Sequence, residues 1–145
     1  MANISDKSGQ ANPVSIVTRK RSWSDLDLGL TLHPIKKDIV PLKDDAAIKS
    51  SIKNLILTNI YERPFQPQLA CNLRGLLFEP ADAITRVSLR EKIKDVIRDY
   101  EPRVSINYIN IKNDSNRNAW NVTINFKIKE FNTNTNVQIG LERLR

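Results

Sequence analysis

The residues whose types and spacing could do chemistry are those of the run Glu101-Pro102-Arg103. Pro102 has no N–H and disfavours helical geometry at the residue before it, so a helix that reaches this run ends there. Glu101 and Arg103 then flank a rigid corner and can grip a partner through charge-assisted hydrogen bonds. The alternative is a plain helix end with two solvated charges. If the corner serves a partner, Arg103→Ala should leave the free domain folded.

Candidate catalytic side chains are few. His33 is the only histidine, Cys71 is the only cysteine, and the glycines form no phosphate loop. His33 precedes Pro34 and is typical of a turn, whereas Cys71 is expected to be a small buried hydrophobe. A glycosidase needs two carboxylates at a set separation, but the 16 acidic residues always allow some pair. The sequence therefore predicts no catalytic residue, no metal site and no cofactor.

The charge balance favours acidic partners. Lys and Arg number 23 against 16 Asp and Glu, a net charge of +7. Residues 1–21 are polar, end in Arg19-Lys20-Arg21 and predict a flexible arm ahead of a single domain at 22–145. Three basic residues are too few to predict nucleic-acid binding. No apolar run approaches a membrane span, and no secretion signal is evident, so we expect work or assembly in a reducing cytoplasm.

The first half of the chain predicts one strand and one helix. Alternation of Leu26, Leu28, Leu30 and Leu32 with polar residues or glycine indicates a half-buried strand. Residues 35–42 form a second short strand or a loop. A helix should begin at Ala46, capped by Asp44 or Asp45. Its apolar face is Ile48, Ile52, Leu55 and Ile56. Residues 61–79 should be irregular, with Phe65 pinned in a pocket between two prolines and one helical turn near Leu73–Leu77.

A long helix should run from its cap, Asp82, to Tyr100. Its predicted buried stripe is Ile84, Val87, Leu89, Ile93, Val96, Ile97 and Tyr100. Basic residues at 86, 90, 94 and 98 form a ridge beside an acidic one at 91, 95 and 99, with pairs Glu91–Lys94 and Asp95–Arg98. The ridge is either a solvated face or a docking surface for an acidic neighbour.

Strands close the chain. Alternating residues from Trp120 to Ile128 predict a strand with one face in the core. Residues 104–111 change parity after Tyr108, which indicates a bulge or a strand covered on both faces. A hairpin loop at 113–118, a polar loop at 132–136 and a last strand at 137–141 follow. The expected fold is α+β: an antiparallel or mixed sheet of about three to five strands with two main helices on one face.

Three stretches occur in order: Tyr61-Glu62-Arg63-Pro64-Phe65-Gln66-Pro67, Leu76-Leu77-Phe78-Glu79 and Tyr100-Glu101-Pro102-Arg103. Together they resemble the GPW-type baseplate-wedge family of contractile phage tails, some of whose members carry a lysozyme label. Relatives include the small baseplate subunit of type VI secretion systems. The family often has a glycine a few residues after the second proline, where this chain has Leu69-Ala70-Cys71, which argues against a positive-φ turn there.

The resemblance implies a structural virion protein of the tail baseplate, not an enzyme, that initiates the tail sheath. It implies contacts with other wedge proteins through Arg63, Glu101, Pro102 and Arg103. The alternatives are a tail-associated peptidoglycan hydrolase and, more weakly, a basic nucleic-acid-binding module.

The last strand should be the acceptor for the sheath protein. Val137, Ile139 and Leu141 lie in a segment with no proline and no charge before Glu142, so it reads as an open edge. The resemblance implies that the sheath protein binds this edge, because sheath subunits of such tails link through exchanged strands. The alternative places this strand inside the sheet, or covers its edge with residues 26–32 or the N-terminal arm.

Overall fold

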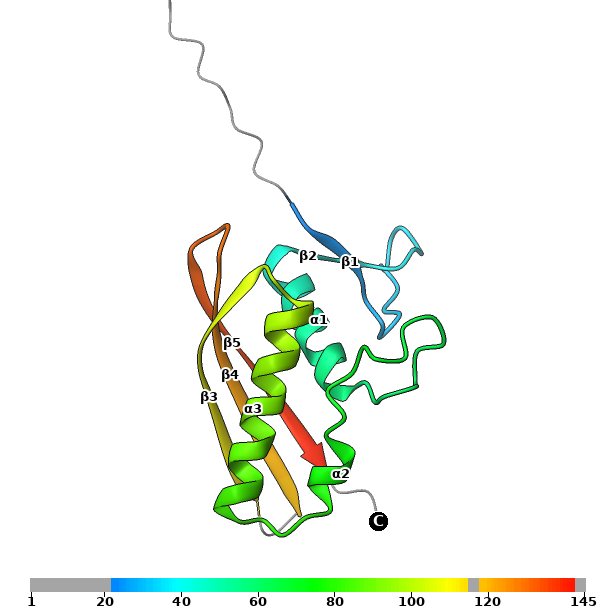
Figure 1. The fold of residues 1–145 in the computed structure, drawn as a ribbon. Helices are drawn as coiled ribbons and strands as arrows, with labels where there is room; N and C mark the ends of the chain where they lie inside the picture. The colour runs from blue at the N-terminus through cyan, green and yellow to red at the C-terminus, as the bar shows by residue number, and fades with distance from the viewer. Residues whose placement is uncertain (1–21, 115–117, 143–145) are drawn as a thin grey trace, which may run out of the picture.

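A three-stranded antiparallel sheet forms one layer of the fold and two helices form the other (Figure 1). The computed structural model describes residues 22–114 and 118–142. The strands are β3 (Val104–Asp114), β4 (Ala119–Ile128) and β5 (Thr133–Glu142), in the order β3-β4-β5. Helices α1 (Asp44–Leu57) and α3 (Ala83–Tyr100) cover one face. The predicted α+β fold is confirmed, while the predicted arm lies outside the described residues.

The central strand β4 anchors the core. Its even-numbered residues from Trp120 to Ile128 are all buried, as the alternation predicts. They form one cluster with side chains of both helices. The opposite face of β4 carries Asn121, Thr123, Asn125 and Lys127. Within the described residues, no helix has both the length and the apolar character needed to cross a bilayer.

The flanking strands β3 and β5 confirm one prediction and correct another. A register shift between Ile106 and Tyr108 confirms the bulge in β3. The turn from β4 to β5 occupies residues 129–132, and β5 begins at Thr133, so the predicted polar loop at 132–136 is wrong. The shorter turn closes because Asn132 adopts a φ of 54°, which asparagine tolerates. The predicted hairpin loop at 113–118 falls partly outside the described residues, and β3 extends to Asp114.

Helix α1 begins two residues before the predicted start. Lys43 is the N-cap and makes no side-chain cap. The carboxylate of Asp44 instead accepts a hydrogen bond from the N–H of Trp23 at 3.1 Å. The predicted capping role of Asp44 or Asp45 is therefore wrong, because the carboxylate of Asp44 ties the incoming chain to the helix. The predicted apolar face of α1 is buried and confirmed.

Helix α3 begins and ends where the sequence predicts. Asp82 accepts a hydrogen bond from the N–H of Thr85 at 2.8 Å and caps the helix. Three of its predicted stripe residues, spaced four apart, are buried: Leu89, Ile93 and Ile97. Ile84, Val87 and Tyr100 are exposed, so the predicted stripe is too wide. The ion pairs Glu91–Lys94 and Asp95–Arg98 both form.

The N-terminal part of the domain forms a small hairpin apart from the main sheet. Strands β1 (Ser24–Leu26) and β2 (Pro41–Lys43) pair antiparallel, and residues 27–40 project from them as a loop (Figure 1). The predicted strand through Leu26–Leu32 is wrong, because the chain turns at Asp27. The C=O of Asp27 accepts from Leu30 at 3.0 Å, and its carboxylate accepts from Gly29. The four alternating leucines are consequently exposed.

The connection between α1 and α3 is irregular, as expected. Its one helical turn is α2 (Arg74–Leu77). Cys71 and Leu73 are buried, whereas Phe65 is 98% exposed, so the prediction that Phe65 fills a pocket is wrong in the free chain. Asn72 adopts a φ of 47°, which asparagine tolerates, so a positive-φ turn follows Cys71 although the chain has no glycine there. The expectation that such a turn is absent is wrong.

Candidate partner-docking site

The Glu101-Pro102-Arg103 corner reverses the chain from α3 into β3. Glu101 leaves helical geometry at φ −127° and ψ 71°, while its N–H still donates to the C=O of Ile97 at 2.9 Å. The C=O of Glu101 then accepts from Val104 at 3.3 Å. Because Pro102 cannot extend the helix, the corner is fixed by local backbone bonds.

The carboxylate of Glu101 points inward and is not solvated. Its side chain is 2% exposed. Oε2 accepts from Nη2 of Arg103 at 2.7 Å and from Oγ of Ser51 on α1 at 2.7 Å, and Oε1 accepts from Nε of Arg103. The alternative of two solvated charges is therefore wrong, because Glu101 is buried and paired within the chain. Glu101 and Arg103 form a bidentate ion pair within the chain. A contact of Glu101 with a partner stays a prediction.

Arg103 has an inner and an outer side. Its hydrogen bond to Glu101 raises the pKa of the guanidinium above its ordinary value. The guanidinium also lies 5.5 Å from the ring centre of Trp23, within reach of a cation–π contact, and Trp23 meets Phe131 edge-on at 5.1 Å. About a third of the Arg103 side chain, 33%, remains exposed. That part alone is available to another protein.

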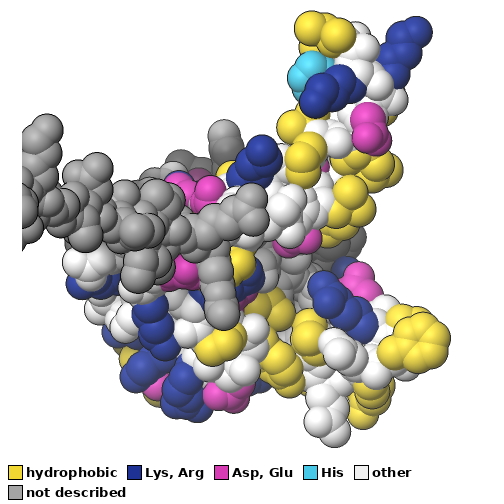
Figure 2. Space-filling view, turned by 90° about the horizontal axis from the view of Figure 1, so that it is seen from above, with side chains coloured by type: hydrophobic (Ala, Val, Ile, Leu, Met, Phe, Trp, Pro, Cys, Tyr) yellow, Lys and Arg dark blue, Asp and Glu magenta, His cyan; other side chains and the backbone are white. Residues whose placement is uncertain are grey.

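A groove of about 310 Å³ opens beside the corner. Its lining comes from Asp25, Leu26 and Leu28 near β1, from Ser51, Asn54 and Leu55 of α1, and from Arg63, Leu69 and Tyr100. Figure 2 shows a hollow between two projecting arms with hydrophobic side chains along both. Ser51 belongs to this lining and also bonds to Glu101, so the groove and the ion pair share a residue.

Arg63 reaches this groove from the loop between α1 and α2. That loop closes on itself through the N–H of Tyr61 and the C=O of Pro67 at 3.0 Å, and Tyr100 donates to the C=O of Gln68 at 3.2 Å. The structure thus brings Arg63 to the same groove as the end of α3. Ser51 and Trp23 are functional candidates that the sequence did not single out. No local pattern could reveal Ser51, which lies 50 residues from Glu101.

The open edge of β5 is the second candidate site, and hydrogen-bond parity tells which of its groups are free. The N–H of Lys129 donates to the C=O of Arg103, directly opposite it, at 3.0 Å. In an antiparallel ladder the main-chain N–H and C=O groups of successive residues point alternately to one neighbouring strand and to the other. The odd-numbered residues of β4 therefore bond to β3, and the even-numbered ones bond to β5. The β5 residues that bond to β4 therefore include Val137, Ile139 and Leu141.

The free main-chain groups of β5 belong to the alternate residues Asn136, Gln138 and Gly140. This corrects the prediction in detail: the side chains of Ile139 and Leu141 are buried, and their main chain is already paired. Among the described residues no strand lies beyond β5, and residues 26–32 do not pair with it. The alternative of a cover by the N-terminal arm concerns residues outside the described ones. All ten pairs from Ala119↔Glu142 to Ile128↔Thr133 run without a shift.

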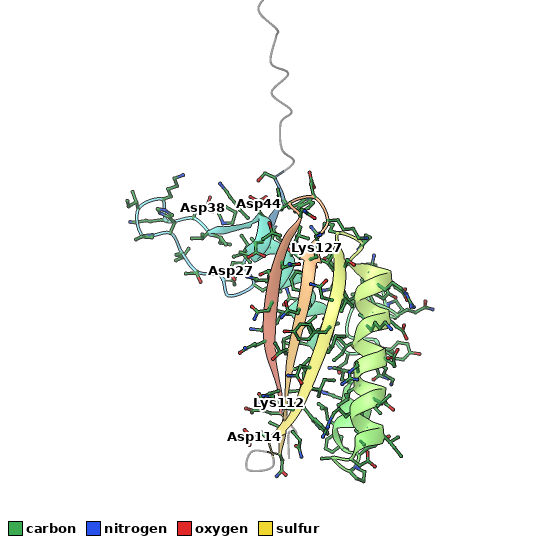
Figure 3. All side chains as sticks on the ribbon, turned by 90° about the vertical axis from the view of Figure 1, so that its left-hand side faces the viewer. Asp27, Asp38, Asp44, Lys112, Asp114 and Lys127 are labelled. Carbon is green, nitrogen blue, oxygen red and sulfur yellow. The ribbon has the colours of Figure 1, made fainter. Side chains whose placement is uncertain are left out.

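Among the described residues, Asp25 is the one carboxylate that lines the groove beside the corner. Asp27 and Asp38 lie out on the loop, while Asp114 lies at the opposite end of the sheet (Figure 3). The Gly29 N–H lowers the pKa of Asp27. Burial raises the pKa of the Cys71 thiol to about 12. No group of three or more potential metal ligands occurs among the described residues.

Within the described residues, an internally paired corner beside a groove of mixed polar and apolar lining, together with a sheet edge that no further strand covers, defines an interaction module. The chain matches the family model of baseplate wedge protein gp25 over residues 43–133. It is 30% identical over 89 residues, 61% of this chain and 67% of the relative, to baseplate wedge protein gp25 of Enterobacteria phage T4. The chain belongs to the baseplate wedge protein gp25 family and is a structural baseplate protein of a contractile tail system.

Solved structures share the fold. A candidate tail lysozyme from Geobacter sulfurreducens aligns with a TM-score of 0.63 at 18% identity, covering 68% of this chain and 89% of that one. A chain of the anti-feeding prophage baseplate aligns at 0.60 and 14%, covering 86% and 88%. A chain of the postcontraction pyocin R2 baseplate aligns at 0.53 and 13%, covering 83% and 98%. At these identities the likeness extends to the fold alone.

Proposed function

We propose that this protein docks on neighbouring wedge proteins through the groove beside the Glu101-Pro102-Arg103 corner and initiates the tail sheath through β5. The observation that carries the proposal is that β5 pairs with β4 without a shift and has no strand beyond it in the described part of the chain. Assembly into the tail baseplate of the virion in the host cytoplasm, with no nucleic-acid partner, completes the proposed role.

The groove suits a segment that carries apolar side chains and an acid. Its lining includes the exposed Leu26 and Leu28 and the half-buried Leu69, and exposed apolar side chains that gather in one place mark interaction sites. Arg63 supplies a cation to the same lining. The exposed side of Arg103 lies nearby, because Ser51 joins the groove lining to the ion pair. A partner would therefore bury leucines and pair with Arg63.

The role of Glu101 is to hold this surface in shape. It fixes Arg103 against Trp23, and the backbone of Trp23 is bonded to Asp44 at the start of α1 by two hydrogen bonds of 3.1 and 2.8 Å. The ion pair thus joins the corner, α1 and the hairpin that carries part of the groove lining. We infer that Glu101 positions the docking residues, while Arg63 and Arg103 contact the partner.

The edge of β5 suits strand addition. Main-chain groups of Asn136, Gln138 and Gly140 face outward, and no charge or proline interrupts them. A sheath strand added to β5 would gain affinity from main-chain hydrogen bonds and register from its alternating side chains.

Docking is tested with Arg63→Glu in tail assembly. Arg63 is exposed and makes no ion pair within the described residues, so the variant should fold like the parent. We expect at least a tenfold loss of incorporation into baseplates, measured by quantifying the subunit in purified particles. Lys53→Glu, an equal charge change on the exposed side of α1, is the matched control and should incorporate normally. Normal incorporation of Arg63→Glu would overturn docking through this groove.

The hydrolase alternative lacks a second carboxylate facing Asp25 in the groove. We expect purified protein to release no more soluble peptidoglycan fragments than buffer does. Turnover that disappears when one carboxylate is changed would replace the structural role with an enzymatic one.

A further inference from the structure

The C-terminal half of a basic ridge on α3 lies beside β3, whose outer edge has no strand partner among the described residues. The members of this ridge, spaced four residues apart on one side of the helix, are Arg86, Arg90, Lys94 and Arg98. The corner sends β3 back antiparallel beside α3 (Figure 1). A groove of about 320 Å³ between them is lined by Lys94 and Arg98 from the helix, Ser105 and Ile106 from β3, and Lys129. The apolar floor includes Ile97 and Val104, and no carboxylate lines it.

The outer edge of β3 has main-chain groups without a strand partner in the described structure. Since the odd-numbered residues of β4 bond to β3, Ser105 before the bulge and Tyr108 and Asn110 after it face β4. The intervening residues Ile106, Ile109 and Ile111 direct their N–H and C=O groups outward. The bulge shifts this pattern by one residue but does not end it.

The ridge and the strand have matching spacings. Four residues of an α-helix rise about 6.0 Å, and two residues of a strand rise about 6.6 Å. Each step along the ridge therefore equals one same-face step along a strand added to β3. From Arg98 to Arg86 the ridge spans about 18 Å, close to the length of six strand residues. Carboxylates on alternate residues of an added strand would meet successive cations.

Two of these cations have no acidic partner. Arg86 and Arg90 make no ion pair within the described part of the chain. Lys94 meets Glu91 only at 3.8 Å. Arg98 is already paired with Asp95 and Asp99, so the attraction centres on residues 86, 90 and 94.

We propose that the β3 edge and the basic ridge of α3 bind an extended acidic segment of another protein chain, with carboxylates at alternate positions. The chain's own residues 1–21 do not fit this ridge, because they hold one acid, Asp6, against Lys7, Arg19, Lys20 and Arg21. A second copy, with a net charge of +7, is repelled overall. This surface lies on the edge opposite β5, and its occupancy is independent of sheath initiation.

The probe is an end-capped nine-residue peptide in which Glu alternates with Val and Thr, titrated into the whole protein. Binding is followed by fluorescence anisotropy and by amide shifts in NMR spectra. We expect shifts at Ile106, Ile109 and Ile111, and at least a tenfold weaker Kd for Arg90→Glu/Lys94→Glu. Lys36→Glu/Lys37→Glu, with the same charge change on the exposed loop, is the matched control and should bind like the parent.

Strand addition is separated from simple charge attraction by a second peptide, N-methylated at every residue whose N–H would meet β3. Its charges are unchanged, so retention of binding would overturn strand addition. Absence of binding by the first peptide at millimolar concentration, or shifts at Gln138 and Gly140 instead of β3, would overturn the proposal. Arg90→Gln/Lys94→Gln serves if the Glu variants misfold, with weaker binding again expected.

Discussion

Oγ of Ser51 lies 2.7 Å from Oε2 of Glu101 and donates a hydrogen bond across 50 residues of sequence. The bond joins the middle of α1 to the end of α3, and Arg103 completes the coordination of the same carboxylate. A buried carboxylate is tolerated only when it is paired and hydrogen-bonded. The corner that we propose as a docking site is thus also part of the internal structure.

Arg103→Ala should destabilise the free protein by about 3 kcal/mol, because it leaves the buried Glu101 carboxylate with Ser51 alone. The value lies at the low end for broken buried pairs, since part of Arg103 is exposed. This prediction replaces the expectation that Arg103→Ala would leave the stability of the free domain unchanged. Urea unfolding of Arg103→Ala, Glu101→Gln and the double variant measures the coupling. A change below about 0.5 kcal/mol for Arg103→Ala would contradict an internal role.

Cys71 should make stability fall at high pH. Burial raises the pKa of its thiol to about 12, against about 8.5 when unfolded. The thiol's contribution is complete below the unfolded value and is lost as the pH rises toward the folded value, by up to about 5 kcal/mol. The measurement is unfolding free energy between pH 8 and about 11 for the parent and Cys71→Ala. Parallel curves for the two proteins would contradict this account, as would rapid labelling of native Cys71 at pH 8.

The Asp82 cap should be sensitive to acid. Its hydrogen bond from the Thr85 N–H lowers the pKa of the carboxyl, so the stabilisation is present above the unfolded value of about 3.9 and is lost as the pH falls through the folded value. Asp82→Ala should lower the melting temperature at pH 7, and the difference should shrink toward pH 2. Asp82→Asn, which can still cap, should lose less. A pH-independent difference would show that the charge of Asp82 is irrelevant.

Local patterns predicted those elements whose causes are local. The Asp82 cap and the Pro102 stop define α3 within a few residues, and unbroken alternation identifies β4. The leucines at 26–32 alternate equally well but form no strand, because Asp27 closes a turn with Gly29 and Leu30. The alternation of apolar residues shows which side chains could face a core, but a turn within the segment can prevent the strand from forming.

The sequence predicted several residues of the candidate site but not how their side chains are arranged. The charges of the corner are evident in sequence, yet the direction of Glu101 depends on Ser51 in another helix. The contact of Arg103 with Trp23 likewise joins two distant segments. The spacing of the ridge in α3 was visible, but only the reversal at Pro102 places it beside β3. Such relationships arise from tertiary packing, which one-dimensional patterns do not encode.

Sheath initiation through β5 is tested with Gln138→Pro. The N–H of Gln138 faces outward, since Val137 and Ile139 are the residues bonded to β4, so its loss removes no bond within the sheet. The side chain of residue 138 lies on the solvent face, where the proline ring meets little resistance. The variant should therefore fold and enter baseplates, yet yield particles with no polymerised sheath in electron micrographs. Gln138→Val keeps the N–H and should support normal sheath, which separates loss of the donor from loss of the amide side chain. A normal sheath on Gln138→Pro particles would exclude β5 as the acceptor strand, and failure to enter baseplates would mean that this edge serves docking instead.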